Sequence, residues 1–170
     1  MDGRICVEIE NRRSIRKYSG EAVTAGQLDL LLEAAMLAPS ACNTRPWEFI
    51  AVTKREILDR MAKVHQYTGV IAGAPAAIVI VALAQQGLAA DFYPQDCGAA
   101  AQNILLQASS MGLGSCWCGI YPKEQPMQAL REILGIPAHK IPFNIIAVGT
   151  ADEAPRRRGS FEKAKVSYVI

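Results

Sequence analysis

One stretch of the chain, from Cys97 to Pro122, contains no charged residue, and its first half has helical spacing. The pattern predicts a helix from about Gln95 to Met111 with Asp96 as its only charge. A helix without a charged face must be covered on all sides. A membrane span needs about 20 predominantly apolar residues, and glutamine, asparagine and serine side chains interrupt this stretch. The sequence therefore predicts a helix packed inside a protein assembly, with no membrane partner.

Composition describes a packed globular chain. The 170 residues are 51% hydrophobic and 20% charged, which fits one domain over residues 1–170. A net charge of +2 gives no global field for nucleic acid or an anionic membrane. The segment from Met1 to Glu10 lacks the apolar core of a signal peptide, and the five cysteines lack disulfide-framework spacing. These features predict a cytoplasmic protein.

Helix and strand signals alternate along the chain, which predicts an α+β fold of three layers, α/β/α, around a mixed and mostly antiparallel sheet. Thr24 and Gln27 have the spacing of a capping box, and Thr53 and Glu56 repeat it. The predicted helices begin at Thr24, Thr53, Gln95 and about Met127, and the predicted strands are Trp47–Val52, Ala76–Ala84, Ser115–Ile120 and Phe143–Val148.

The last residues, Lys165 to Ile170, alternate with the period of a strand through Val166, Tyr168 and Ile170. No neighbouring segment is available to pair with this strand. A lone strand gains hydrogen bonds by adding to a sheet edge. We therefore expect it to be exchanged with a partner subunit.

A basic cluster, Arg12-Arg13-Ser14-Ile15-Arg16, combines guanidinium groups with a hydroxyl. Directed donors together with positive charge suit a phosphate group. The same spacing also fits a solvated basic surface near a helix end. From the residues alone, both interpretations stay open.

Two loops have the composition of ligand sites. In Ala38–Trp47, small residues allow a planar ligand to approach the backbone, and Asn43 both donates and accepts hydrogen bonds; an ordinary proline-bracketed loop is the alternative. The run Gly112–Gly119 is followed by no helix and does not match G-x-G-x-x-G, so a Rossmann site is excluded. Gly119 is a position where main chain can approach a ligand.

Several catalytic patterns are absent from the sequence. It has no Ser-His-Asp order and no Walker loop, and Cys116 and Cys118 have no further ligands nearby to complete a metal site. An anion site and a flat-ligand loop without an acid–base set indicate chemistry borrowed from a cofactor.

Four ordered blocks that cover nearly the whole chain resemble the nitroreductase family. They are RRSIRKY at 12–18, LLEAA…APSACNTRPWEF at 31–49, GLGSCWCGIYP at 112–122 and IPFNIIAVG at 141–149. The resemblance implies an FMN-binding homodimer whose subunit interface builds both active sites. Two departures stand out: Arg45 occupies a position where the family commonly has Gln, and the segment 84–96 is short where larger members insert lid helices.

The resemblance also implies roles for individual residues. Basic and hydroxyl side chains from both ends of the chain would hold the FMN phosphate and ribityl group: Arg12, Arg13, Ser14, Arg16, Arg156 and Arg158. Pro39, Ser40 and Ala41 would reach the flavin of the partner subunit, and Asn43 would address the isoalloxazine edge. The main chain of Cys118 and Gly119 would lie near flavin N5.

The implied activity is ping-pong hydride transfer from NADH or NADPH, through FMN, to small acceptors such as nitroaromatics or quinones. The alternatives are another flavin chemistry on the same fold (dehalogenation, azoline oxidation or flavin fragmentation) and a flavin-binding protein without turnover.

Overall fold

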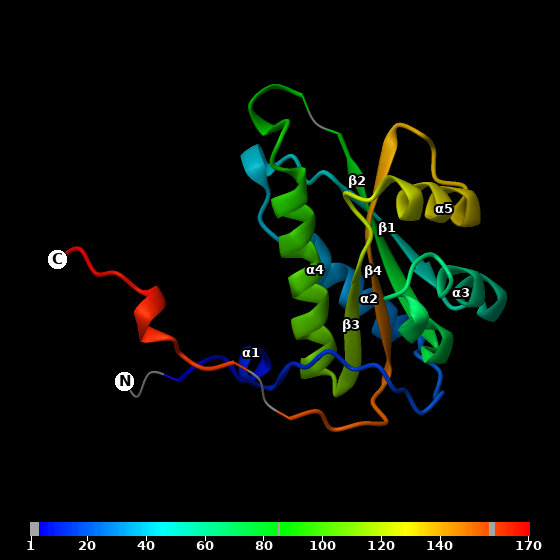
Figure 1. Ribbon diagram of the computed structural model, residues 1–170, viewed down its shortest axis with the longest axis horizontal. Helices are drawn as coiled ribbons and strands as arrows, with labels where there is room; N and C mark the ends of the chain where they lie inside the picture. The colour runs from blue at the N-terminus through cyan, green and yellow to red at the C-terminus, as the bar shows by residue number, and fades with distance from the viewer. Residues whose placement is uncertain (1–3, 85, 157–158) are drawn as a thin grey trace.

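The computed structural model describes residues 4–84, 86–156 and 159–170. Its centre is an antiparallel sheet in the order β1-β2-β4-β3 (Figure 1). The bounds are Trp47–Val52 for β1, Ala76–Leu83 for β2, Leu113–Gly119 for β3 and Lys140–Thr150 for β4. The two central strands are almost entirely buried because both faces of the sheet are covered.

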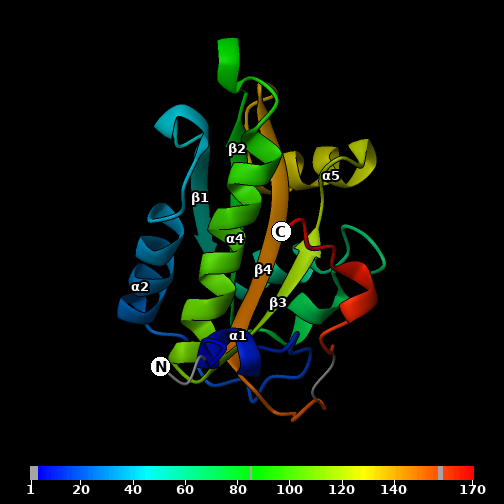
Figure 2. The ribbon, with the colours of Figure 1, turned by 90° about the vertical axis from the view of Figure 1, so that its left-hand side faces the viewer.

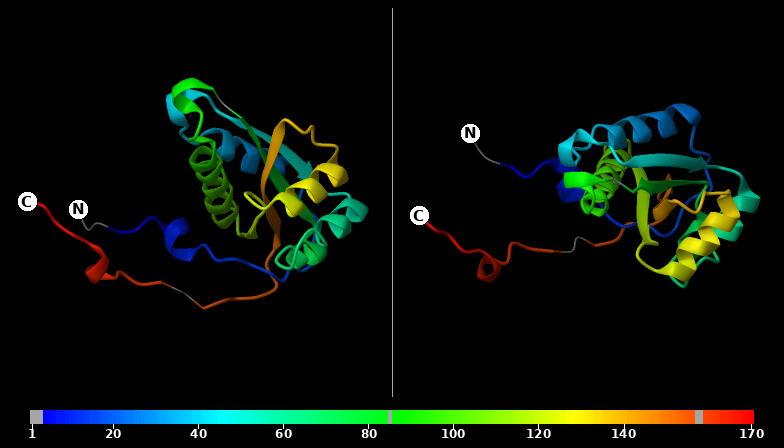
Figure 3. Two further views of the ribbon diagram at one scale, coloured as in Figure 1. Left: turned by 45° about the horizontal axis from the view of Figure 1, so that its top comes forward. Right: turned by 90° about the horizontal axis from the view of Figure 1, so that it is seen from above.

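Helices cover the two faces of this sheet, which confirms the predicted three-layer α+β sandwich (Figure 3). On one face lie α2 (Ala25–Met36) and α4 (Tyr93–Ser110), which pack against each other and the sheet. On the other lie α3 (Arg55–Met61), α5 (Glu124–Leu134) and the short turn η2 (Gly69–Gly73). In the described residues, none of the helices is both long enough and apolar enough to cross a membrane.

The helix ends follow local chemistry, with one correction. Thr24 and Gln27 form the predicted capping box at the start of α2. The predicted cap at Thr53 is wrong: α3 begins at Arg55 after Lys54, and no side chain caps it. Helix α4 begins at Tyr93, slightly before the predicted start, because proline is accommodated in a first helical turn.

Both chain ends run beyond this core. The short helix α1 (Val7–Asn11) crosses the C-terminal end of α4, and the tail beyond β4 projects past the same side of the molecule (Figures 1 and 2). Lys165 belongs to the short helical turn η4 (Lys163–Lys165), and residues 166–170 form no strand within the described chain. Exchange of this segment with a partner subunit stays a prediction.

Candidate functional site

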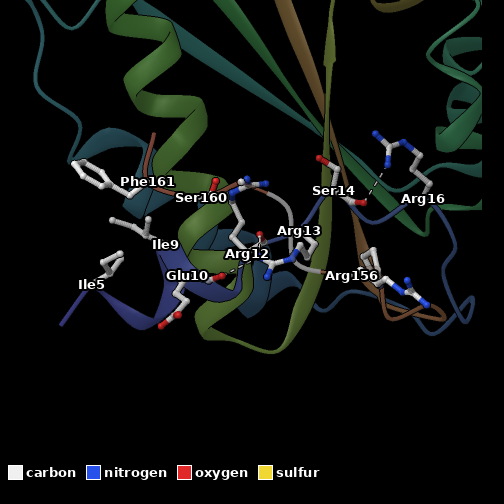
Figure 4. Close-up of a pocket in the computed structure, with 12 residues that line it drawn as sticks. Ile5, Ile9, Glu10, Arg12, Arg13, Ser14, Arg16, Arg156, Ser160 and Phe161 are labelled. Atoms are coloured by element: carbon white, nitrogen blue, oxygen red, sulfur yellow. Dashed lines mark hydrogen bonds between the residues drawn. The ribbon is translucent and has the colours of Figure 1, made fainter. Parts of the chain in front are cut away.

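A cavity of about 900 Å³ lies between α1, the segment that follows it and the C-terminal tail (Figure 4). Apolar side chains gather at one end of it and basic side chains occupy the middle and the other end (Figure 4). The apolar residues are Ile5, Ile9 and Phe161, and the polar residues include Arg12, Arg13, Ser14, Arg16, Arg156 and Ser160. The structure thus brings together every residue predicted for the phosphate end except Arg158, which lies outside the described residues.

Long-range contacts hold the basic segment against β3. The N–H of Ile15 donates to the carbonyl of Ser115 at 2.9 Å. Gly114 makes this approach possible, because a Cβ there would lie 2.7 Å from Cγ2 of Ile15. From the tail, the carboxylate of Glu153 accepts hydrogen bonds from the N–H groups of Arg16 and Lys17. The cluster is therefore an ordered part of the fold, not only a solvated surface.

The arginines of the cavity differ in what they contact. Arg13 donates from Nη1 to the carbonyls of Glu10 (2.8 Å) and Arg12 (2.7 Å), so it satisfies the C-terminal end of α1. Arg16 makes a longer contact of 3.3 Å with the carbonyl of Ser14. Within the described residues, no carboxylate forms an ion pair with Arg12, Arg16 or Arg156. Their positive charge is available to an anion.

The outer edge of β3 begins beside the basic segment, where Ile15 bonds Ser115, and runs toward Gly119. The N–H of Ile120 bonds the carbonyl of Phe143 on β4 at 3.2 Å. Because main-chain groups alternate along an antiparallel strand, the N–H groups of Trp117 and Gly119 point away from β4. Ser115, beside the arginines, and Gly119 are four residue steps apart on the strand, a distance of about 13 Å at 3.3 Å per residue.

Gly119 is a glycine that the fold alone does not require. Its φ lies outside the left-handed region, and an added Cβ would meet nothing within 4 Å. Neither backbone strain nor packing therefore explains the missing side chain. Open space beside an outward-pointing N–H is what a planar ligand lying against the strand would use.

The thiols on β3 face the opposite way, into the layer of α3 and α5. Cys118 is buried, and its Sγ lies 3.6 Å from the carbonyl of Tyr67. The neighbouring Cys118 thiol lowers the pKa of the Cys116 thiol, as do the charges of Arg16 and Arg12, against the effects of burial and of Glu153. The neighbouring Cys116 thiol and burial raise the pKa of Cys118. Cys118 therefore presents no thiol at the outer edge, and because its own N–H points toward β4, the outward main-chain donor beside it is the N–H of Gly119.

The predicted ligand loop between Ala38 and Trp47 lies far from the cavity. The turn η1 (Ala41–Asn43) sits near the N-terminal end of α4, and α1, which lines the cavity, crosses the C-terminal end of α4 (Figures 1 and 2). The 18 residues of α4 span about 27 Å. Within one chain, Pro39, Ser40, Ala41 and Asn43 therefore do not line the arginine cavity.

This loop holds an unusual backbone. Cys42, Asn43 and Arg45 all have positive φ values, between 49° and 53°, a region that non-glycine residues rarely adopt. The hydroxyl of Ser40 accepts the N–H of Arg45 at 2.9 Å. The guanidinium of Arg45 donates to the carbonyl of Met36 at 3.2 Å, so it stabilises the end of α2. The charge that replaces the common Gln thus has a structural contact of its own.

Sequence reasoning missed three residues that organise the site. Asp96 is 6% exposed, and its Oδ1 accepts the N–H of Ala41 at 3.0 Å from the first turns of α4. His65 contacts the carbonyl of Gly119 at 2.9 Å. Glu153 holds the basic segment from the far end of the chain. Each acts across 54 or more residues, so no local spacing could have indicated it.

The fold and the cavity define an α+β protein with a basic site whose arginine segment is bonded to an edge strand. A sequence model of the nitroreductase family matches residues 9–68 and 65–150. A Methanothermobacter thermautotrophicus protein provisionally named NADH dehydrogenase/NAD(P)H nitroreductase is 42% identical over 158 residues, which cover 93% of this chain and 83% of the relative. An Archaeoglobus fulgidus protein with the same provisional name is 44% identical over 142 residues, covering 83% of this chain and 82% of the relative.

Solved structures agree with the sequence relatives. A Parabacteroides distasonis protein, also provisionally named NADH dehydrogenase/NAD(P)H nitroreductase, superposes with a TM-score of 0.90 at 35% identity, covering 95% of both chains. An FMN-dependent nitroreductase of Clostridium difficile gives a TM-score of 0.88 at 34% identity, covering 95% of this chain and 96% of that one. The chain belongs to the nitroreductase family of oxidoreductases.

Proposed function

We propose that the protein is an FMN-dependent oxidoreductase that transfers electrons from NADH or NADPH to small acceptors such as nitroaromatics or quinones, in a ping-pong sequence. The observation that carries the proposal is that the arginine segment, which lines the cavity, is bonded through Ile15 to Ser115 on the edge strand β3. The arginine segment fits the phosphate end of FMN, and the outer edge of β3 near Gly119 fits the ring end.

The arginine cavity fits the phosphate end. Arg12, Arg16 and Arg156 bring to one cavity guanidinium groups that form no ion pair with the described carboxylates, together with the hydroxyl of Ser14. Guanidinium groups bind phosphate oxygens through charge-assisted hydrogen bonds. Arg13 is assigned to the same group of ligands, although its Nη1 also holds the end of α1.

The strand edge fits the ring end. The outward N–H groups of Trp117 and Gly119 offer main-chain donors to the polar edge of an isoalloxazine. The open space at Gly119 allows the ring to lie close to the backbone. Bound FMN would supply the hydride chemistry, while the chain binds the phosphate and orients the ring.

The proposed assembly is a homodimer with shared sites. The outer face of α4 presents uncharged residues at helical spacing, among them Gln95, Gly98, Gln102 and Leu106. An isologous contact that packs this face against a second copy in antiparallel orientation places the N-terminal end of one helix beside the C-terminal end of the other. The partner's η1 would then lie beside this chain's cavity. The length of α4, about 27 Å, keeps η1 away from the cavity of its own chain, and a second subunit would bring the two together.

The proposed location is the cytoplasm. Cys6, Cys42, Cys97, Cys116 and Cys118 are all free thiols. Free cysteines persist in reducing compartments, where disulfides are rare.

The test begins with the absorbance of the purified protein, which we expect to show non-covalently bound FMN. Anaerobic titration with NADH and, separately, NADPH should bleach the flavin, and a nitroaromatic or a quinone should restore its absorbance. Steady-state nicotinamide oxidation with varied acceptor should give the parallel lines of a ping-pong mechanism. Protein that is colourless and takes up no added FMN contradicts the proposal. Protein that binds FMN but supports no turnover would be a flavin carrier or sensor.

A further inference from the structure

His65 lies in the loop between α3 and η2, and its imidazole reaches the free edge of β3. Nε2 lies 2.9 Å from the carbonyl oxygen of Gly119. Nδ1 accepts a hydrogen bond from the N–H of Tyr67 at 3.1 Å. Because Nδ1 accepts, the ring hydrogen of the neutral imidazole is on Nε2, and Nε2–H donates to Gly119. The contacts on the two nitrogens thus define one tautomer.

The loop that carries the imidazole is itself held by a buried hydroxyl. Thr68 is 0% exposed, and its Oγ1 accepts the N–H of His65 at 3.1 Å. The same oxygen lies 2.8 Å from the carbonyl of His65 and 3.1 Å from the carbonyl of Ala62. These contacts fix the backbone of His65 next to the last turn of α3, so the direction of the ring is set before any ligand binds.

The bond from His65 completes the restraint of one peptide group. The carbonyl of Gly119 is held by His65, and the N–H of the next residue, Ile120, is held by Phe143 at 3.2 Å. Glycine has more conformational freedom to lose than any other residue, so a glycine at the end of an edge strand needs such restraint to hold one geometry. The N–H of Gly119 lies on the same side as the carbonyl that His65 holds.

We propose that His65 is the positioning residue that orients Gly119 for its contact with the ring of the cofactor. The inference rests on the proposed function, which places an isoalloxazine at this strand edge. Both nitrogens of the imidazole are engaged by main-chain groups. The ring therefore has no hydrogen or lone pair left for a substrate, and its role is to hold the peptide, not to transfer a proton.

The experiment compares His65→Ala with His65→Gln, whose side-chain amide keeps an N–H donor. The matched control is His139→Ala, which removes the other histidine, an exposed residue just before β4. Amide hydrogen exchange at Gly119 and Ile120 is measured in the apoprotein, and the FMN dissociation constant and the position of the visible flavin band are measured after loading. Circular dichroism and thermal melting establish that each variant is folded.

In His65→Ala we expect faster amide exchange at Ile120, an FMN dissociation constant about three to ten times higher, and a shifted flavin band. His65→Gln should recover a large part of all three, and His139→Ala should change none of them. Unchanged exchange in folded His65→Ala overturns the proposal, because the peptide is then held without the imidazole.

Faster amide exchange at Ile120 with unchanged FMN affinity and an unchanged flavin band also overturns the proposal. The hydrogen bond between His65 and Gly119 would then hold only the loop of His65 against β3. A failure of the proposed function appears separately, in the wild type. If wild-type protein binds no FMN, the assignment of His65 fails together with the proposed function, whatever the variants show.

Discussion

In the proposed dimer, the two ends of α4 carry two different halves of a site. At its C-terminal end, the arginine cavity is assembled from both ends of the chain and fixed by the bonds of Ile15 to Ser115 and of Arg16 to Glu153. At its N-terminal end, η1 and the residues just after it are mostly exposed and strained, with Cys42, Asn43 and Arg45 at positive φ. The C-terminal half has a cavity lined by charged residues. The N-terminal half has a strained backbone, and η1 lines none of the three cavities found among the described residues.

The contrast between the arginine cavity and η1 shows how an incomplete site can be recognised in a single chain. Backbone strain is retained where the surrounding structure over-determines it, and it concentrates at ligand sites. Here the strained turn is anchored by a buried carboxylate, that of Asp96, and the turn lines none of the three cavities found among the described residues. A partner's cavity is the ligand site that such a turn would complete.

The largest expected effect comes from separating the two halves. Gln102 is exposed and lies near the midpoint of α4, so in an antiparallel isologous contact it would face its own copy. Gln102→Arg places two like charges together in a desolvated contact, which is strongly unfavourable. We expect a monomer by light scattering and the loss of bound FMN.

The control is Gln102→Ala, which removes the amide without adding charge and should remain a yellow dimer. A monomeric Gln102→Arg protein that keeps FMN with unchanged affinity would show that the cavity end suffices for FMN binding. The partner's η1 would then contribute nothing to it.

A smaller effect is expected from the cavity end alone. Arg16→Ala removes a charge-assisted contact worth about 1.5–3 kcal/mol, so the FMN dissociation constant should rise by about tenfold to a hundredfold. Fluorescence titration of the apoprotein with FMN measures this constant, and the dimer should persist. Arg60→Ala, which removes an arginine from the last turn of α3, is the matched control. Equal FMN affinity in Arg16→Ala and wild type would mean that the arginines form only a solvated surface.

The sequence predicted those parts of the molecule that local pattern encodes. The capping box at Thr24, the buried strand β2 and the charge-poor α4 follow from spacing within a few residues, and the structure confirms them. Thr53 was a wrong prediction because the same spacing occurs without a cap when the helix starts at Arg55. Capping depends on backbone geometry that two side chains do not determine.

The candidate site divides in the same way. The Arg12–Arg16 cluster is visible as residue types, but its attachment to Glu153 crosses 137 positions and leaves no periodic signal. The contact of His65 with Gly119 crosses 54 positions, and a lone histidine carries no spacing that would assign it a partner. Residue chemistry thus indicates what the site contains, and only the tertiary fold shows what holds it.

The smallest expected effect concerns the anchor of η1. Oδ1 of Asp96 accepts the N–H of Ala41, while Oδ2 is buried without a hydrogen-bond partner in the described chain. Asp96→Ala removes the acceptor and should weaken FMN binding by about three- to tenfold, the range of one ordinary hydrogen bond. Asp96→Asn keeps a carbonyl acceptor for Ala41 and should bind FMN nearly as the wild type does. Titration is done on protein shown to be dimeric, with Asp59→Ala, a surface aspartate of α3, as the control. Full affinity in Asp96→Ala would show that the anchoring of Ala41 does not contribute to FMN binding. An equal loss of affinity in Asp96→Ala and Asp96→Asn would show that the charge of Asp96 matters and its role as an acceptor does not.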